Sequence, residues 1–286
     1  MLFLTRRHFT LGASLAAMAT LASRPARADD LWKTLPLPPA PIEPTSKGYI
    51  DLPTTRIWHA VYGSGPTVVL LHGGLGHGEV WGNQINHLAK THTVITIDSR
   101  GHGRSTEPTD GYSYAKMAED VKAVLTKLGV APAPIIGWSD GGIIGLELAM
   151  AHPGVMSKGF LFGANYDLSG LKDGIDKDPV FSNYIGLMAE DYKKLSTTPD
   201  KFDAFVGNIS KMWYSEPSYT TEQLAKIATP VVITDGAYDE AIRQEHTAAM
   251  AKAIPGAKLL VMKDVSHFAM WQDPAQFNAA IDAFLA

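Results

Sequence analysis

Short apolar runs alternate with longer segments of helical spacing along most of the chain. Residues 67–71 (TVVLL) and 93–97 (TVITI) are continuous apolar runs of the kind found in strands that are buried on both faces. Residues 114–128 instead repeat apolar side chains at helical spacing and stop before Gly129, a residue type that commonly ends helices. Strands that alternate with helices predict an α/β fold, with a mostly parallel central sheet flanked by helices.

The alternation continues to the end of the chain, apart from one interruption. Residues 50–62 predict two strands around a turn at Pro53. The remaining elements follow the same two patterns. Strands are expected at 134–136, 159–162, 230–234 and 258–262, and helices at 141–151, 243–254 and 274–285.

Residues 166–229 interrupt this rhythm, because they contain no strand-like run and only helical spacing rich in aromatic residues. We expect this segment to be a helical lid inserted into the sheet domain. Its large side chains could line an apolar pocket or hold the lid on the sheet domain, and each of them fits both roles. They are Phe181, Tyr184, Met188, Tyr192, Phe202, Phe205, Met212, Trp213 and Tyr214.

The N-terminus carries the features of an export signal. Arg6 and Arg7 precede an apolar, alanine-rich run at 11–21, and residues 26–28 (ARA) form a small-x-small cleavage site. The pattern resembles a bacterial twin-arginine signal. The apolar run is shorter than the roughly 20 residues that a membrane-spanning helix needs. We therefore expect cleavage after residue 28, a periplasmic or secreted protein, and no stable membrane insertion afterwards.

Five segments are thus expected along the chain. Residues 1–28 are the export signal, and the Pro-rich residues 29–46 form a leader that is strapped to the surface or disordered. The sheet domain comprises residues 47–165 and 230–286, and the lid comprises residues 166–229 between them.

Composition narrows the chemistry and the partners. The 286 residues include no cysteine, which excludes thiol catalysis, thiolate-bound zinc and disulfides. Removing residues 1–28 leaves 21 basic residues against 29 acidic ones, a formal charge of −8. An acidic surface repels nucleic acid and anionic lipid, so we expect neither as a partner.

Residues 137–141 (GWSDG) fit the pattern G-x-S-x-G in the context that this pattern requires. An apolar strand is expected before it and a helix rich in small residues after it. In such a tight turn, glycines avoid clashes with the backbone and the serine is presented at a helix N-terminus. Ser139 is therefore the candidate nucleophile.

A serine nucleophile needs a base, and the base needs an orienting group. We expect the last strand to end at Val265, so that His267 follows it and can act as the base. Asp239 lies in a turn after the preceding strand, and the order Ser139, Asp239, His267 agrees with the Ser-acid-His order of the hydrolase fold. Asp235 and Asp167 remain alternatives, although the turn at Gly236 should carry Asp235 toward the edge of the sheet.

A third group of residues could stabilise the reaction and bind substrate. An oxyanion needs backbone N–H donors, and we expect these from Asp140 and from Gly74, with Leu75 as the alternative to Gly74. His72 is expected to be a structural hydrogen-bonding residue. The expected contacts with substrate are Leu75, Trp138, Trp213 and Phe268.

No cofactor or metal is expected. His72, His77, His87 and His92 lack the spacing of zinc-binding motifs, and residues 73–76 lack the spacing of a dinucleotide-binding loop.

Several motifs together resemble the α/β-hydrolase superfamily, from about Tyr49 to the C-terminus. They are residues 72–74 (HGG), 98–105 (DSRGHGRS), 137–142 (GWSDGG), 236–239 (GAYD) and 266–268 (SHF). The GWSDGG segment is most similar to the biphenyl hydrolase-like and valacyclovir hydrolase-type branch of serine ester hydrolases. The resemblance implies that residues 98–105 shape a loop beside the site, with Arg100 and His102 structural.

The residues and the resemblance predict a serine hydrolase that cleaves carboxylic esters of small to medium apolar substrates through an acyl-enzyme. The same three residues would also serve an aminopeptidase or amidase, or a cofactor-free perhydrolase. A protein that uses the fold only to bind a ligand is the alternative from another class. The sequence leaves the natural substrate and the oligomeric state open.

Replacing both Arg6 and Arg7 with lysine should keep the precursor in the cytoplasm. Lysine keeps the positive charge, but a twin-arginine export system recognises the arginines themselves. Cell fractionation followed by N-terminal sequencing measures both the compartment and the cleavage site. Normal export of this variant, or a wild-type protein that still begins at Met1, would contradict the export signal.

Overall fold

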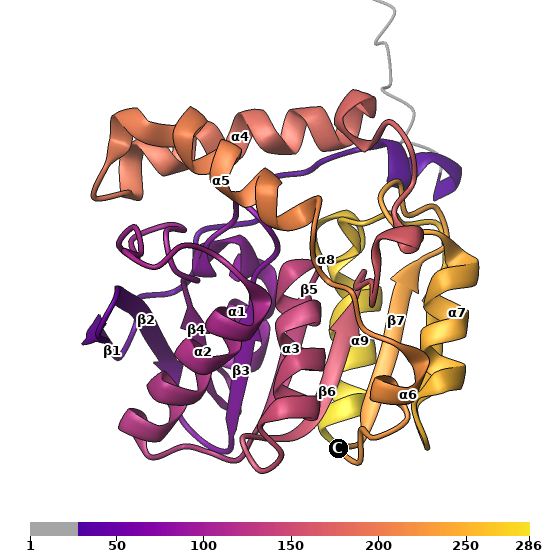
Figure 1. The fold of residues 1–286 in the computed structure, drawn as a ribbon, viewed down its shortest axis with the longest axis horizontal. Helices are drawn as coiled ribbons and strands as arrows, with labels where there is room; N and C mark the ends of the chain where they lie inside the picture. Colours follow the sequence, from indigo (N-terminus) through magenta and orange to yellow (C-terminus); the bar gives the residue numbers. More distant parts are fainter. Residues whose placement is uncertain (1–27) are drawn as a thin grey trace, which may run out of the picture.

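An eight-stranded sheet forms the centre of the molecule, in the order β1-β2-β4-β3-β5-β6-β7-β8 (Figure 1). The computed structural model describes residues 28–286, so nearly all of the expected export signal lies outside the described residues. β2 pairs antiparallel with β1 and β4, and all other neighbouring strands are parallel. The strands are β1 Ser46–Asp51, β2 Arg56–Gly63, β3 Thr67–Leu71, β4 Thr93–Ile97, β5 Ala133–Trp138, β6 Met156–Phe162, β7 Val231–Gly236 and β8 Lys258–Met262. The predicted α/β architecture is confirmed.

Helices cover both faces of this sheet (Figure 1). α2 (Tyr114–Leu128) and α3 (Asp140–Ala151) pack side by side on one face. α1 (Gly82–Leu88), α8 (Ala269–Gln272) and α9 (Pro274–Leu285) pack together on the other face, and α7 (Gln244–Ala253) packs against β7. α2 has the predicted bounds: the Ser113 hydroxyl accepts a hydrogen bond from the Lys116 N–H, and Gly129 ends the helix at φ +70°.

Residues 166–229 leave the sheet after β6 and return at β7, and we call this segment the insertion. It contains α4 (Pro179–Leu195), α5 (Phe202–Trp213) and α6 (Thr221–Leu224), together with three short 3₁₀ turns. α4 begins at Asp178, whose carboxylate accepts hydrogen bonds from the first free N–H groups of the helix. α4 and α5 lie across one end of the sheet (Figure 1), and their buried side chains pack toward it.

The leader that precedes β1 follows the surface of the sheet domain. The Gln272 side chain donates hydrogen bonds to the backbone carbonyls of Trp32 and Thr34, and the Asn86 amide bonds the backbone at Ala40 and Ile42. The Trp32 ring also stacks on Tyr238 at 4.8 Å. Residues 32–42 of the leader are therefore bound to the surface of the sheet domain, which is the first of the two states expected for it.

The end of the sheet differs from the prediction in one respect. β8 ends at Met262, as its apolar run predicts, and does not continue to Val265 as the position of His267 suggested, because the chain turns at Asp264, which has φ +58°. β8 is also an edge strand whose Leu259, Leu260 and Val261 are exposed. Its apolar run reads like that of a buried strand, so periodicity alone does not reveal its exposure.

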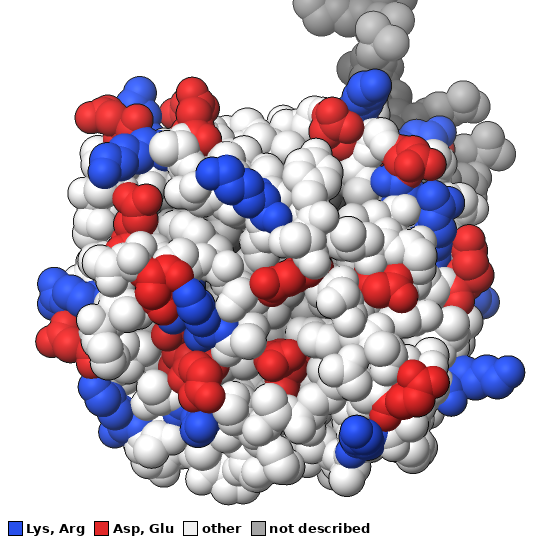
Figure 2. Space-filling view, viewed as in Figure 1, with Lys and Arg blue, Asp and Glu red and all other residues white. Residues whose placement is uncertain are grey.

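The described surface carries mixed charge. Figure 2 shows acidic and basic side chains interspersed over the face drawn, and interspersed charges give little long-range attraction for a polyanion. Within residues 28–286 no helix is long and apolar enough to cross a membrane.

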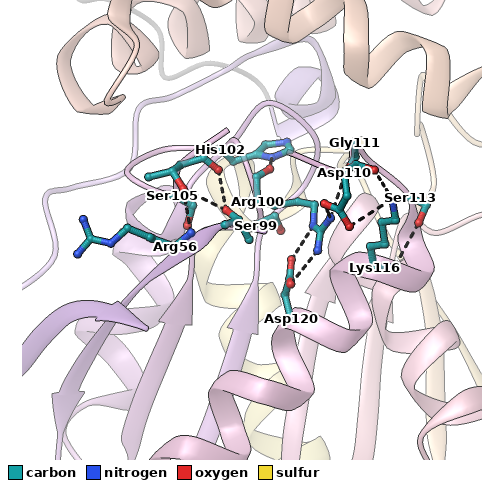
Figure 3. Close-up of polar contacts among 12 residues, drawn as sticks. Arg56, Ser99, Arg100, His102, Ser105, Asp110, Gly111, Ser113, Lys116 and Asp120 are labelled. Carbon is teal, nitrogen blue, oxygen red and sulfur yellow. Dashed lines mark hydrogen bonds and ion pairs between the residues drawn. The ribbon is translucent and has the colours of Figure 1, made fainter. Parts of the chain in front are cut away.

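The loop after β4 is held by a buried ion pair (Figure 3). The Arg100 guanidinium donates to both carboxylate oxygens of Asp120 on α2, at 2.7 and 2.9 Å, and also to Asp110 at 2.9 Å. Arg100 and Asp120 are nearly fully buried, with their side chains 4% and 7% exposed. The Ser105 hydroxyl donates to the Asp98 carbonyl in the same loop. Arg100 thus has the structural contacts expected of it.

Replacing Arg100 with methionine should lower the free energy of unfolding by about 3 kcal/mol, because the Asp120 carboxylate would remain buried without its partner. Arg56→Met is the matched control: Arg56 bonds Asp51 at the same 2.7 Å, but both side chains are more than half exposed, and such pairs contribute at most about 1 kcal/mol. Urea unfolding measures both variants. Equal losses would show that burial does not decide the contribution of the Arg100 pair.

Candidate active site

Ser139 sits on a tight turn between β5 and α3, with φ 53° and ψ −118°. Neighbouring backbone leaves no room for side chains on either side of it. A Cβ at Gly137 would lie 2.3 Å from the Gly141 carbonyl oxygen, and a Cβ at Gly141 would lie 2.2 Å from that of Leu71. The two glycines of the motif are therefore required by close packing, which fixes the serine in a strained conformation.

The turn places Ser139 at the N-terminus of α3. The first N–H groups of a helix, here those of Asp140 and Gly141, have no acceptor within the helix. Such free donors, together with the helix dipole, favour a negative charge beside the serine.

His267 and Asp239 form a short polar contact between two buried side chains. His267 Nδ1 and Asp239 Oδ2 are 2.6 Å apart, and both side chains are almost fully buried. The other carboxylate oxygen accepts hydrogen bonds from the N–H groups of Ala241 and Ile242, both at 2.7 Å. Asp239 is thus held from two sides while it bonds the histidine.

Neither of the two alternative aspartates bonds His267. Asp167 caps a 3₁₀ turn through a hydrogen bond from the Ser169 N–H. Asp235 is fully buried and bonds the Gly236 N–H and the Thr247 hydroxyl, so the expectation that it points toward the sheet edge is wrong. The reason is that Asp235 still belongs to β7, where its side chain packs under α7. Of the three carboxylates, Asp239 is the one hydrogen-bonded to His267.

Burial and charge oppose each other in this pair. Burial lowers the pKa of His267, but the charge of Asp239 and the hydrogen bond to it raise that pKa above its ordinary value. Burial likewise raises the pKa of Asp239, yet the His267 charge and hydrogen bonds bring it below the ordinary value. With Nδ1 donating to Asp239, the neutral imidazole keeps Nε2 free as an acceptor.

Glu240 adds a second carboxyl group beside the histidine. Its Oε2 accepts a hydrogen bond from the His267 backbone N–H at 3.1 Å, whereas Oε1 has no partner among the described residues. Burial and the neighbouring charge of Asp239 raise the pKa of Glu240 to about 7. Glu240 therefore changes charge near neutral pH, directly beside the histidine.

Ser139 and His267 line one cavity of about 580 Å³, a volume suited to a small molecule. Among the described residues no hydrogen bond joins the serine hydroxyl to His267, and such contacts often tighten only when substrate is bound. The rest of the lining is mainly apolar. Prominent members are Leu168, Leu171, Ile175, Phe181, Ile185, Val206, Ala241 and Ile242.

The loop after β3 forms another wall of the cavity. Gly74 and Leu75 both line it, and Leu75 has φ +62°, which is unusual for a leucine. Tyr184 of the insertion donates its hydroxyl proton to the Gly74 carbonyl at 2.8 Å. His72 bonds the Gly73 carbonyl and accepts from the Ser99 N–H, and burial lowers its pKa to about 4, so it remains neutral and structural.

Asp140 also lines this cavity, and its carboxylate makes contacts that the sequence did not reveal. It accepts hydrogen bonds from the Tyr114 hydroxyl at 2.9 Å and from the Trp213 indole N–H at 3.0 Å. Burial raises its pKa to about 6. The contact joins α3 to α5 of the insertion, so residues that are 73 positions apart meet beside the serine.

Three of the four predicted substrate contacts line the cavity, namely Leu75, Trp138 and Trp213. Phe268 does not: it is fully buried and packs against Trp138 and Tyr184. Phe268 directly follows His267, but its side chain packs in the core and not in the cavity, where it was expected.

The large side chains of the insertion divide between the two roles that the sequence left open. Phe181, Tyr184, Trp213 and Tyr214 line the cavity, whereas Met188, Tyr192, Phe205 and Met212 are buried in the core contacts of α4 and α5. The apolar residues at 168–175 were missed because they lie among lysines, aspartates and glycines that read as a loop.

Within residues 28–286 no three histidine or acidic side chains lie where they could hold a metal ion.

Several known proteins are similar to this chain in sequence and in fold. Residues 66–191 match the family described as alpha/beta hydrolase fold. The uncharacterized hydrolase YraK of Bacillus subtilis is 38% identical over 110 residues, which are 38% of this chain and 41% of that protein. RutD of Cronobacter turicensis, to which carbamate hydrolysis is ascribed, is 27% identical over 81% of this chain and 95% of its own length.

A solved structure extends the likeness. Est816, described as an N-acyl homoserine lactone degrading enzyme, superimposes with a TM-score of 0.67 and is 28% identical, over 83% of this chain and all of that chain. The chain has the fold of the α/β hydrolases, and the family match and these relatives support that superfamily for it. Within that superfamily its relatives are hydrolases, and it is a hydrolase of the α/β fold.

Replacing Gly163 with alanine should displace His267, because the new Cβ would lie 2.8 Å from its Cε1 and 2.9 Å from its Nδ1. Gly129→Ala is the matched control, since Gly129 has a similar positive φ with nothing within 4 Å. The proton on Nδ1, moved far downfield in ¹H NMR by a short hydrogen bond to a carboxylate, is the readout. We expect it to be lost or shifted in Gly163→Ala alone. An unchanged resonance in Gly163→Ala would contradict this contact.

Proposed function

We propose that the protein is a serine hydrolase that cleaves carboxylic esters of small to medium apolar substrates through an acyl-enzyme. The observation that carries this proposal is the buried 2.6 Å contact between Asp239 and His267, beside a strained serine that lines the same cavity. A histidine fixed by a carboxylate and facing a serine at a helix N-terminus is an arrangement suited to acyl transfer.

The proposed reaction has two halves. His267 Nε2 takes the proton of the Ser139 hydroxyl as its oxygen attacks the ester carbonyl, and the imidazolium then protonates the leaving alcohol. Water attacks the resulting acyl-enzyme with His267 again as base, which releases the acid and restores the serine. Asp239 fixes the histidine tautomer and stabilises its cation throughout.

Backbone donors would stabilise the oxyanion in both halves. The Asp140 N–H at the start of α3 is one donor, and the loop after β3 supplies the other from Gly74 or Leu75. Oriented donors of this kind contribute about 3–4 kcal/mol each to the stability of the transition state.

The cavity supports apolar substrates of modest size. Its volume of about 580 Å³ and its aliphatic and aromatic lining suit a compact acyl or alcohol group. Lactones are a second candidate class, favoured by the 28% identity to a lactone-degrading enzyme over most of the chain. RutD is described as a carbamate hydrolase, and carbamates are related substrates that also carry a carbonyl group. We propose that the reaction takes place outside the cytoplasm, after export of the chain.

A fluorophosphonate probe and a substrate panel test the proposal together. The wild-type protein should be labelled at Ser139 and should hydrolyse p-nitrophenyl butyrate faster than matched anilides or long-chain esters, because the cavity is apolar and limited in volume. Ser139→Ala should lose both labelling and turnover. Asp239→Asn should lower kcat by up to about 10⁴-fold with little change in KM, because the wrong tautomer of His267 is favoured.

Three results would count against the assignment. Labelling without turnover of any ester, lactone or amide would favour a ligand-binding protein that has kept the fold. Comparable rates on short-chain and polymeric esters would contradict a pocket that selects compact substrates. Preferred turnover of anilides would favour an amidase.

A further inference from the structure

A third carboxyl group lies behind the Asp239–His267 pair and is not used in the reaction above. Asp235 is the next-to-last residue of β7 and is fully buried. Its Oδ1 accepts a hydrogen bond from the Gly236 N–H at 2.8 Å, and its Oδ2 accepts one from the Thr247 hydroxyl of α7 at 2.7 Å. Its carboxyl group is also within hydrogen-bonding reach of the Asp239 carboxyl.

Two carboxyl groups in such contact, both removed from water, cannot both be ionised, so one of them holds a proton. Asp239 is surrounded by donors: two backbone N–H groups and the His267 ring, which can carry a positive charge. Asp235 is bonded by one N–H and one hydroxyl, and both of these groups are neutral. The negative charge is therefore more stable on Asp239, and the proton on Asp235.

The direction of the pKa shifts agrees with this division. Burial, and then the neighbouring charge of Asp239, raise the pKa of Asp235 well above its ordinary value. The pKa of Asp239 is instead lowered, because the charge of His267 and the hydrogen bonds from His267 and Asp235 outweigh its burial.

We propose that Asp235 is a positioning residue, a neutral carboxylic acid that donates its proton to the Asp239 carboxylate and so holds Asp239 against His267. The contact gives Asp239 a fourth donor, after the N–H groups of Ala241 and Ile242 and the ring of His267. A carboxylate bonded on all sides keeps one orientation and is a weaker base, so the Nδ1 proton stays on the histidine during turnover. The effect on turnover rests on the proposed function, whereas the location of the proton does not.

The groups around this pair set the pH dependence. Glu240 follows Asp239 in the same loop, His267 follows β8, and the Lys172 ammonium from the insertion donates to the Asp239 carbonyl. His246 is the neighbour of Thr247 on α7, and burial lowers its pKa. The charge on Asp235 is the quantity in question, because an ionised Asp235 would raise the pKa of His267 and a neutral one would not.

Two substitutions at Asp235 test whether its carboxyl group is neutral or ionised. Asp235→Leu removes the donor and should lower kcat for p-nitrophenyl butyrate at least about tenfold, with KM changed less than about threefold. Asp235→Asn replaces the acid by a neutral donor and should restore kcat to within about threefold of wild type. Its acid limb of kcat/KM, which reports the pKa of His267, should stay in place. A shift of that limb to lower pH by half a unit or more would overturn the proposal, because it would mean that a negative charge was removed.

Carboxyl ¹³C NMR locates the proton without any activity. In protein labelled at the aspartate carboxyl carbons, one resonance should stay at the protonated position at neutral pH, where aspartates with an ordinary pKa are ionised. It should disappear in Asp235→Asn and shift in Thr247→Val, which assigns it even where the first variant does not fold. An Asp235 resonance at the ionised position near neutral pH overturns the proposal. Failure to hydrolyse any ester would instead overturn the proposed function and leave this measurement intact.

Discussion

Close contact between backbone segments at the turn from β5 to α3 determines where the rest of the site lies. Neighbouring carbonyl oxygens come so near to positions 137 and 141 that only glycine fits, and the serine between them takes a positive φ. The turn is at the carboxyl end of a strand flanked by β3 and β6, with β7 and β8 beyond β6. Since these strands are parallel, the loops after them reach the same end of the sheet, and Gly74, Asp239 and His267 come from those loops.

Much of this arrangement could be read from the sequence, because strong local patterns and the parallel topology agree with each other. The bounds of β3, β4 and α2 follow directly from apolar runs and from a glycine at the helix end. The contact of Asp239 with His267 could be expected from chain order, since residues after successive parallel strands meet at one edge. Apolar runs, helix-ending residues and chain order can all be read directly from the sequence, which is why these features could be predicted.

Features that depend on distant neighbours left no such trace. Nothing near position 140 indicates that its carboxylate bonds an indole 73 residues later, and nothing near position 268 indicates that the phenylalanine turns into the core. The burial of Asp235 depends on how α7 packs over β7, and the exposure of β8 depends on its place at the sheet edge. Division of the insertion's aromatic residues between cavity and core likewise depends on how α4 and α5 cross the sheet.

The Asp140 carboxylate has a consequence for what the cavity retains. Burial brings its pKa to about 6, so it is mostly ionised at neutral pH within the lining of the cavity. A neutral ester and the acid released from it differ by one negative charge at that pH. For the ester cleavage that we propose, the fixed negative charge of Asp140 in the cavity lining raises the free energy of the acid anion there and has little effect on the neutral ester. In the proposed reaction, the Asp140 charge would thus favour release of the acid product over its retention.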